Sequence, residues 1–143
     1  MRVMIAAIFC ILTCINGAFS QVAVIANTSV PVDQIEKNEL ENFYTGDIRK
    51  WNNGEPIIVF DLKAKGEVQE TFYNFLGKST SRMKSIWMKN MLSGEGDPPE
   101  SIPSEEEVLK KVASTPGAIG FVSQAKTSEE VKILIVIRKE NGS

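Results

Sequence analysis

Short, uninterrupted apolar runs alternate along this chain with longer segments in which apolar residues recur every three or four positions. The runs at 22–26, 57–60, 118–122 and 132–137 contain almost no polar residues, and such continuous runs are typical of strands buried on both faces of a sheet. The periodic segments predict amphipathic helices that would cover those faces. The pattern therefore indicates an α/β domain with the element order β-α-β-α-α-α-β-β.

Four segments between the runs carry helical spacing. Gly46 and Gly77 can take the left-handed conformation that ends the first and second helices. Ser104 and Glu107 form a capping box at the start of the fourth helix. The stretch 94–103 is rich in glycine and proline, and we expect a loop there. The apolar positions of the four predicted helices are Ile35, Leu40, Phe43 and Tyr44, then Val68, Phe72, Phe75 and Leu76, then Met83, Ile86, Trp87 and Met91, and finally Val108, Leu109, Val112 and Ala113.

The segment 115–122 predicts a sharp corner between the fourth helix and the next strand. Pro116 cannot continue a helix, and Gly117 can adopt the left-handed conformation that closes one. Gly120 lies inside the apolar run that follows, where the missing side chain lets another backbone or a ligand approach closely.

The first 20 residues have the organisation of a secretory signal peptide. Arg2 provides a positive start, residues 3–15 are almost continuously apolar, and residues 18–20 are of the kind that a signal peptidase recognises. We expect cleavage between Ser20 and Gln21 and export through the Sec pathway to the periplasm. No second apolar stretch of that length follows, so no membrane span is expected after the signal is removed.

Both cysteines, Cys10 and Cys14, fall within that signal segment. An alternative interpretation makes Cys14 the lipidated residue of a lipoprotein, but Thr13 is a poor residue immediately before a lipidation site. The mature chain would consist of one domain at 21–138 and a polar tail at 139–143, with no thiol for a disulfide.

The chain contains no histidine. This excludes Ser-His-Asp and Cys-His catalysis and, with the cysteines confined to the signal segment, the usual zinc and copper sites. We therefore expect no enzyme activity, no metal and no cofactor. The formal net charge of −2 does not favour binding to nucleic acid.

A resemblance to a known family rests on motifs spread over 22–136. They comprise Phe43, Gly46, Trp51, Asn53-Gly54, Pro56-Ile57, Phe72, Trp87, Gly94, Pro98 and the run from Thr115 to Val122. In this order and spacing they resemble the phosphate-binding periplasmic proteins of ABC importers. Full-length members close two lobes around the anion, whereas this chain is similar to one lobe, as are short single-domain relatives. The resemblance implies a single lobe of the type II periplasmic-binding-protein fold.

The ligand residues of that family are partly absent here. In full-length members an R-x-x-S-G-T-like segment follows the second strand, but the equivalent stretch of this chain lacks arginine, serine and threonine. What remains are Lys63, Lys65 and the backbone amides of Gly66, Glu67 and Val68, which can attract an anion at a helix N-terminus. The carboxylate of Glu67 opposes that attraction.

Other polar and aromatic residues have both a functional and a structural interpretation. In α/β sheets, ligands bind beyond the carboxyl ends of the strands, so Thr28 and Ser29 after the first strand would add donors to the anion site. The structural alternatives are an ordinary turn there and solvated lysines at the helix N-terminus. Trp51 and Trp87 could be binding platforms, but burial in the core is favoured.

The resemblance implies an exported solute-binding module that recognises phosphate or a similar small oxyanion for an ABC importer or a sensor. The module would work alone or as a homodimer that supplies the missing lobe. The loss of family ligand residues supports an alternative, a ligand-free envelope protein that keeps the fold and binds a protein partner. An enzyme such as a hydrolase is a third hypothesis, which no nucleophile motif favours.

Overall fold

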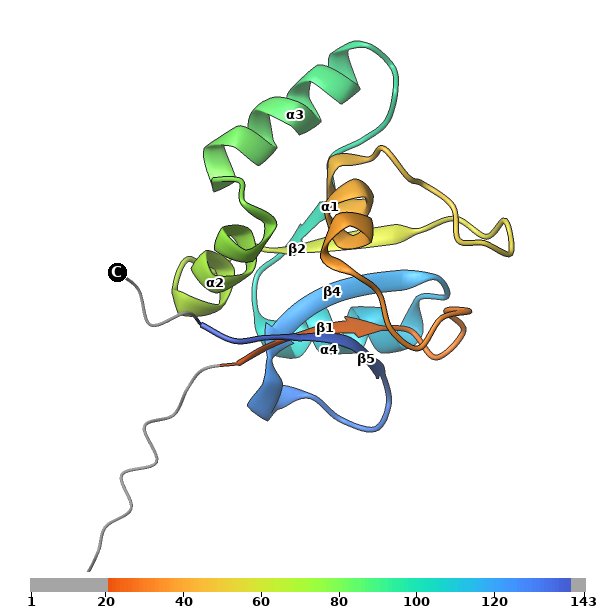
Figure 1. Ribbon diagram of the computed structural model, residues 1–143, viewed down its shortest axis with the longest axis vertical. Coiled ribbons are helices and arrows are strands. Elements are labelled where there is room, and N and C mark those ends of the chain that lie inside the picture. The colour runs from red at the N-terminus through yellow and green to blue at the C-terminus, as the bar shows by residue number, and fades with distance from the viewer. Residues whose placement is uncertain (1–20, 140–143) are drawn as a thin grey trace, which may run out of the picture.

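The computed structural model describes residues 21–139, which form one five-stranded mixed sheet with helices packed on both of its faces (Figure 1). The predicted signal peptide and the end of the polar tail lie outside the described residues. The elements are β1 (Val22–Ala26), α1 (Lys37–Thr45), β2 (Ile58–Leu62), α2 (Glu67–Leu76), α3 (Thr80–Leu92), β3 (Glu100–Ile102), α4 (Glu105–Ser114), β4 (Ala118–Ser123), a 3-10 turn (Gln124–Lys126) and β5 (Lys132–Ile137).

The sheet has the strand order β3-β2-β4-β1-β5. Strand β2 runs parallel to both of its neighbours, β3 and β4, whereas β1 runs antiparallel to β4 and β5. Val22 at the start of β1 therefore pairs with Ser123 at the end of β4 and with Ile137 at the end of β5. The domain is α/β as predicted. Strand β1 runs in the direction opposite to that of the other four strands.

Alternate residues of β4 face helices on opposite sides of the sheet. The Phe121 ring stacks on Phe72 of α2, with ring centroids 3.8 Å apart and planes 5° apart, and it also contacts Tyr44 of α1. Gly120 points the other way, toward α4, where an added Cβ would lie 2.8 Å from Val108. The close approach at Gly120 is thus made by helix side chains, not by a backbone or a ligand.

The corner after α4 is built as its sequence predicts. Gly117 has φ 76°, and an added Cβ would lie 2.5 Å from the carbonyl oxygen of Pro56. The Trp51 indole donates a hydrogen bond of 3.0 Å to the Gly117 carbonyl. Trp87 donates likewise to the Tyr44 carbonyl at 2.8 Å. Because both tryptophans are buried with their N–H groups satisfied, they belong to the core and do not form binding platforms.

The helix boundaries follow the predicted signals closely. Gly46 and Gly77 end α1 and α2 with φ of 84° and 74°. Ser104 Oγ accepts a hydrogen bond of 3.3 Å from the Glu107 amide at the start of α4. The first helix is shorter than its apolar pattern suggests, because α1 begins at Lys37 and leaves Ile35 in the preceding loop.

One strand lies inside the stretch predicted to be a loop. Glu100–Ile102 forms β3, which pairs in parallel with the end of β2 and buries Ile102. The predicted element order holds for every element that it names, and β3 is inserted between α3 and α4. A three-residue strand between Pro99 and Pro103 is too short to show a hydrophobic period.

Candidate functional site

The two groups of predicted ligand residues lie at opposite ends of the sheet. Strands β2 and β4 end where α2 begins, at the edge that carries Lys63 and Gly66. Since β1 is antiparallel to β4, its carboxyl end lies at the other edge, where the Asn27 amide donates to the Ala118 carbonyl at 2.9 Å. One small anion cannot contact both Thr28-Ser29 and the α2 N-terminus, so the expectation of a shared edge is wrong.

The polar residues after β1 join that turn to the end of α4 and to the corner before β4. The Asn27 side-chain amide donates to the carbonyls of Val112 and Ala113 at the end of α4, at 2.8 and 3.0 Å. Ser29 Oγ accepts a hydrogen bond of 3.0 Å from the Gly117 amide. Thr28 is exposed on the same turn. The hydrogen bonds therefore support the structural interpretation of these residues as an ordinary turn.

The remaining five predicted residues do lie together, around the N-terminus of α2. Lys63 and Lys65 are exposed in the connection from β2, and Gly66 is the N-cap residue of α2, with Glu67 and Val68 in the first turn. The Glu67 carboxylate pairs with Lys139 at 3.0 Å, which offsets the charge that would repel an anion. The first turn of a helix lies at the positive end of the helix dipole, which favours negative charge near this edge.

A buried acid lies just behind that edge. Asp61 in β2 is 8% exposed, and its Oδ1 accepts a hydrogen bond of 2.5 Å from the Tyr73 hydroxyl of α2. Burial raises the pKa of Asp61, and the hydrogen bond from Tyr73 offsets part of that rise. Burial and the nearby Asp61 also raise the pKa of Tyr73. Sequence reasoning did not single out Asp61, although an acid inside an apolar run was a usable signal.

The raised pKa of Asp61 predicts a pH-dependent stability. Between its ordinary pKa of 3.8 and its higher folded-state pKa, the folded protein binds more protons than the unfolded chain. The contribution of Asp61 to stability is therefore complete at low pH and is lost as pH rises through the folded-state pKa. Each unit of pKa difference corresponds to about 1.4 kcal/mol. Asp61→Asn should remove this loss while keeping an acceptor for Tyr73.

Urea unfolding of wild type and Asp61→Asn over a pH series would measure the effect. Other carboxylates titrate in both proteins, so the informative quantity is the difference between their free energies of unfolding. As pH rises above about 4, the free energy of unfolding of Asp61→Asn should increase relative to that of wild type. A difference that does not change with pH would contradict the assignment.

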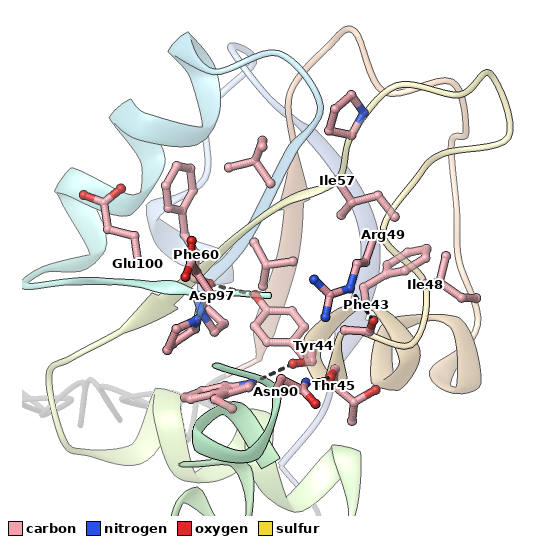
Figure 2. Close-up of a pocket in the computed structure, with 17 residues that line it drawn as sticks. Phe43, Tyr44, Thr45, Ile48, Arg49, Ile57, Phe60, Asn90, Asp97 and Glu100 are labelled. Atoms are coloured by element: carbon pink, nitrogen blue, oxygen red, sulfur yellow. Dashed lines mark hydrogen bonds between the residues drawn. The ribbon is translucent and has the colours of Figure 1, made fainter. Parts of the chain in front are cut away.

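A pocket of about 380 Å³ lies at the opposite end of the sheet, beside the start of β2 and β3. Figure 2 shows Arg49 pointing into it, with Ile48, Ile57 and Asn90 around it. None of the seven predicted ligand residues lines this pocket. No sequence motif marks Arg49 as a site residue. The residues around it come together only when the loop after α3 folds against the end of α1.

Within residues 21–139, no group of three or more acidic residues is placed to hold a metal ion. Over the same range, no helix combines the length and the apolar character that a membrane crossing needs.

Comparisons with known proteins agree with this architecture. The model of the PBP superfamily domain matches residues 12–138. No curated protein sequence is significantly similar to this chain. Among solved structures, a proposed phosphate ABC transporter substrate-binding protein from Clostridium perfringens, solved with bound phosphate, is 16% identical with a TM-score of 0.66, over 81% of this chain and 45% of that one.

Two further structures are similar over the same share of this chain. An ABC-type phosphate transport receptor from Vibrio cholerae is 17% identical with a TM-score of 0.63, over 81% of this chain and 46% of its own. PstS from Borrelia burgdorferi is 16% identical with a TM-score of 0.58, over 81% and 47%. The chain thus spans less than half the length of these structures, and the likeness concerns the fold of one lobe. The chain belongs to the PBP superfamily and has the fold of a single lobe of phosphate-type substrate-binding proteins.

Proposed function

We propose that this protein is an exported solute-binding module that recognises phosphate or a similar small oxyanion at the N-terminus of α2. The observation that carries the proposal is the placement of Lys63, Lys65 and the first amides of a ten-residue helix at one open edge of the sheet. Oriented amides and the helix dipole favour an anion there, and two cations add to the attraction. The phosphate named for the C. perfringens structure supports the choice of ligand.

The proposed site has a single wall. The buried Asp61 stands behind it, and the stretch from Lys63 to Gln69 contains no arginine that could provide a bidentate fork for the anion. A small anion on one open face keeps most of its water, so binding should be weak for the single lobe. A second copy of this chain would supply an opposite wall. An ABC importer or a sensor is the partner to which such a module would deliver its ligand.

Calorimetric titration of the protein, purified after expression from the full-length sequence, tests this function. Phosphate should give a saturable heat, and Lys63→Ala with Lys65→Ala should weaken the affinity about tenfold, since each exposed charge pairing contributes about 0.2–1 kcal/mol and two such losses together amount to about 1.4 kcal/mol. The matched control is Lys50→Ala with Lys110→Ala, which removes the same charge from exposed positions elsewhere. Flat titrations with phosphate and sulfate at millimolar concentrations would overturn the proposal, as would equal losses in the two double variants.

A further inference from the structure

The Arg49 side chain lies in the pocket at the start of β2 (Figure 2), against the backbone of Gly46 and Gly96. Its Nε donates a hydrogen bond of 2.9 Å to the Gly46 carbonyl. An added Cβ on Gly96 would lie 1.7 Å from Nη1 and 2.5 Å from Cζ, and one on Gly46 would lie 3.2 Å from Nη2. Backbone therefore lies directly against the guanidinium group, in a position that a side chain on Gly96 would block.

Asn90 at the end of α3 fixes both glycines. Its side-chain amide donates to the Thr45 carbonyl at 2.9 Å, next to Gly46. Its main-chain carbonyl accepts from the amides of Glu95 and Gly96, at 2.8 and 3.3 Å. These bonds tie the loop after α3 to the end of α1. The guanidinium group is thus positioned before any ligand arrives, which lowers the entropic cost of binding.

The outer edge of that guanidinium group is available for a ligand. Among residues 21–139, Arg49 makes no ion pair, and its two Nη atoms make no hydrogen bond. An arginine side chain stays charged, and the free edge between Nη1 and Nη2 matches the two oxygens of a carboxylate. The side-on edge is occupied by the bond from Nε to Gly46, so only an end-on pairing is open.

The rest of the lining selects among anions. Ile48 and Ile58 are 38% and 37% exposed, and Pro56 and Pro98 add apolar surface to the same pocket. Asp97 also lines it, and a second acid of the lining, Glu100, is paired with Lys111 on α4 at 2.9 Å. Negative charge in the same pocket disfavours a dianion, and the apolar walls offer no donors for further oxygens.

We propose that this pocket binds a single carboxylate attached to an apolar group. The carboxylate pairs end-on with Nη1 and Nη2 of Arg49, and the apolar group covers Ile48 and Ile58. The pocket volume of about 380 Å³ suits a ligand of amino-acid or short-peptide size. This chemistry is found both in a free apolar acid and in the C-terminus of a peptide. The site lies at the opposite end of the sheet from α2 and is independent of the proposed oxyanion site.

NMR titration of the 15N-labelled protein, expressed from the full-length sequence, tests the proposal with two pairs of probes. Each pair consists of an acid and its neutral amide. N-acetyl-leucine should bind in the millimolar range, and N-acetyl-leucinamide about tenfold more weakly, because the amide lacks the charge that Arg49 pairs with. The shifted resonances should be those of Arg49 Nε, Ile48 and Ile58. Acetyl-Gly-Gly-Leu and its amide form the second pair. Tighter binding of this peptide than of N-acetyl-leucine identifies a peptide C-terminus as the ligand, and equal binding identifies the free acid.

Variants separate the guanidinium fork from charge alone. Arg49→Lys keeps the charge but loses the fork and the bond to Gly46, and it should weaken N-acetyl-leucine binding about tenfold. Gly96→Ala should do the same by displacing the guanidinium group, and Lys50→Gln, at an exposed neighbouring cation, should leave binding unchanged. Thermal unfolding checks that each variant is folded. Equal binding of acid and amide, unaltered binding by Arg49→Lys, or shifts confined to α2 would overturn the proposal.

Discussion

Gly117→Ala is expected to lower the free energy of unfolding by about 3 kcal/mol, because two penalties combine at this residue. With φ at 76°, an alanine would have to occupy the left-handed region, which costs about 1–2 kcal/mol. Its Cβ would also lie 2.5 Å from the Pro56 carbonyl oxygen, a main-chain atom that a rotamer change cannot move. The shift needed to relieve this contact would disturb the hydrogen bond from Trp51 to the Gly117 carbonyl.

Gly54→Ala is the matched control for this prediction. Gly54 has φ 83°, close to that of Gly117, but no atom lies within 4 Å of an added Cβ. Its substitution should therefore cost only the conformational part, about 1–2 kcal/mol. Urea unfolding of both variants with unchanged m-values measures the difference. Equal losses in the two variants would show that contact with Pro56 does not constrain the corner.

The corner, the buried strands and the helix ends were predictable because their signals are local. Gly117 follows a proline at the end of an amphipathic segment, so its left-handed conformation can be inferred from neighbouring residues alone. The same reasoning predicted Gly46 and Gly77 as helix stops. Such signals depend on a few consecutive residues, which is why they survive folding without change.

Features that depend on the path of the chain through space were not predictable in this way. The apolar run of β1 is the same whichever direction it takes in the sheet, yet its antiparallel direction moves Thr28 and Ser29 to the edge opposite the proposed anion site. Strand β3 likewise becomes a strand only because β2 offers it an edge, which buries Ile102. Strand direction and edge pairing are tertiary properties.

The candidate sites show the same division. Lys63, Lys65 and Gly66 were predicted because they lie in the stretch equivalent to the ligand segment of the resembled family, where a helix start follows a strand in a local pattern. Arg49 was not found, because Gly96, which the guanidinium group lies against, belongs to a distant loop. The buried state of Asp61 depends similarly on Tyr73, which α2 carries over the end of β2. Sites assembled from separate segments need the fold before their chemistry can be recognised.

Phe72→Ala is expected to give the largest loss of stability, about 4 kcal/mol. Phe72 is fully buried, stacks on Phe121 with centroids 3.8 Å apart, and makes edge contacts with Tyr44 and Tyr73 at 4.8 and 5.1 Å. Removing the ring leaves a cavity among three aromatic side chains that hold α1, α2 and β4 together. Tight packing prevents those rings from collapsing into the space, so the cavity adds to the lost burial.

Phe75→Ala tests whether this loss reflects packing and not helix propensity. Both substitutions replace phenylalanine by alanine in α2, but Phe75 is only partly buried, with Lys37 above its ring at 5.7 Å. Its loss should be about 1–2 kcal/mol, because less apolar surface returns to water. If Phe72→Ala does not fold, Phe72→Leu should still fold and lose more stability than Phe75→Leu in urea unfolding. Equal losses in either matched pair would contradict a core centred on the Phe72–Phe121 stack, which holds α2 against the sheet.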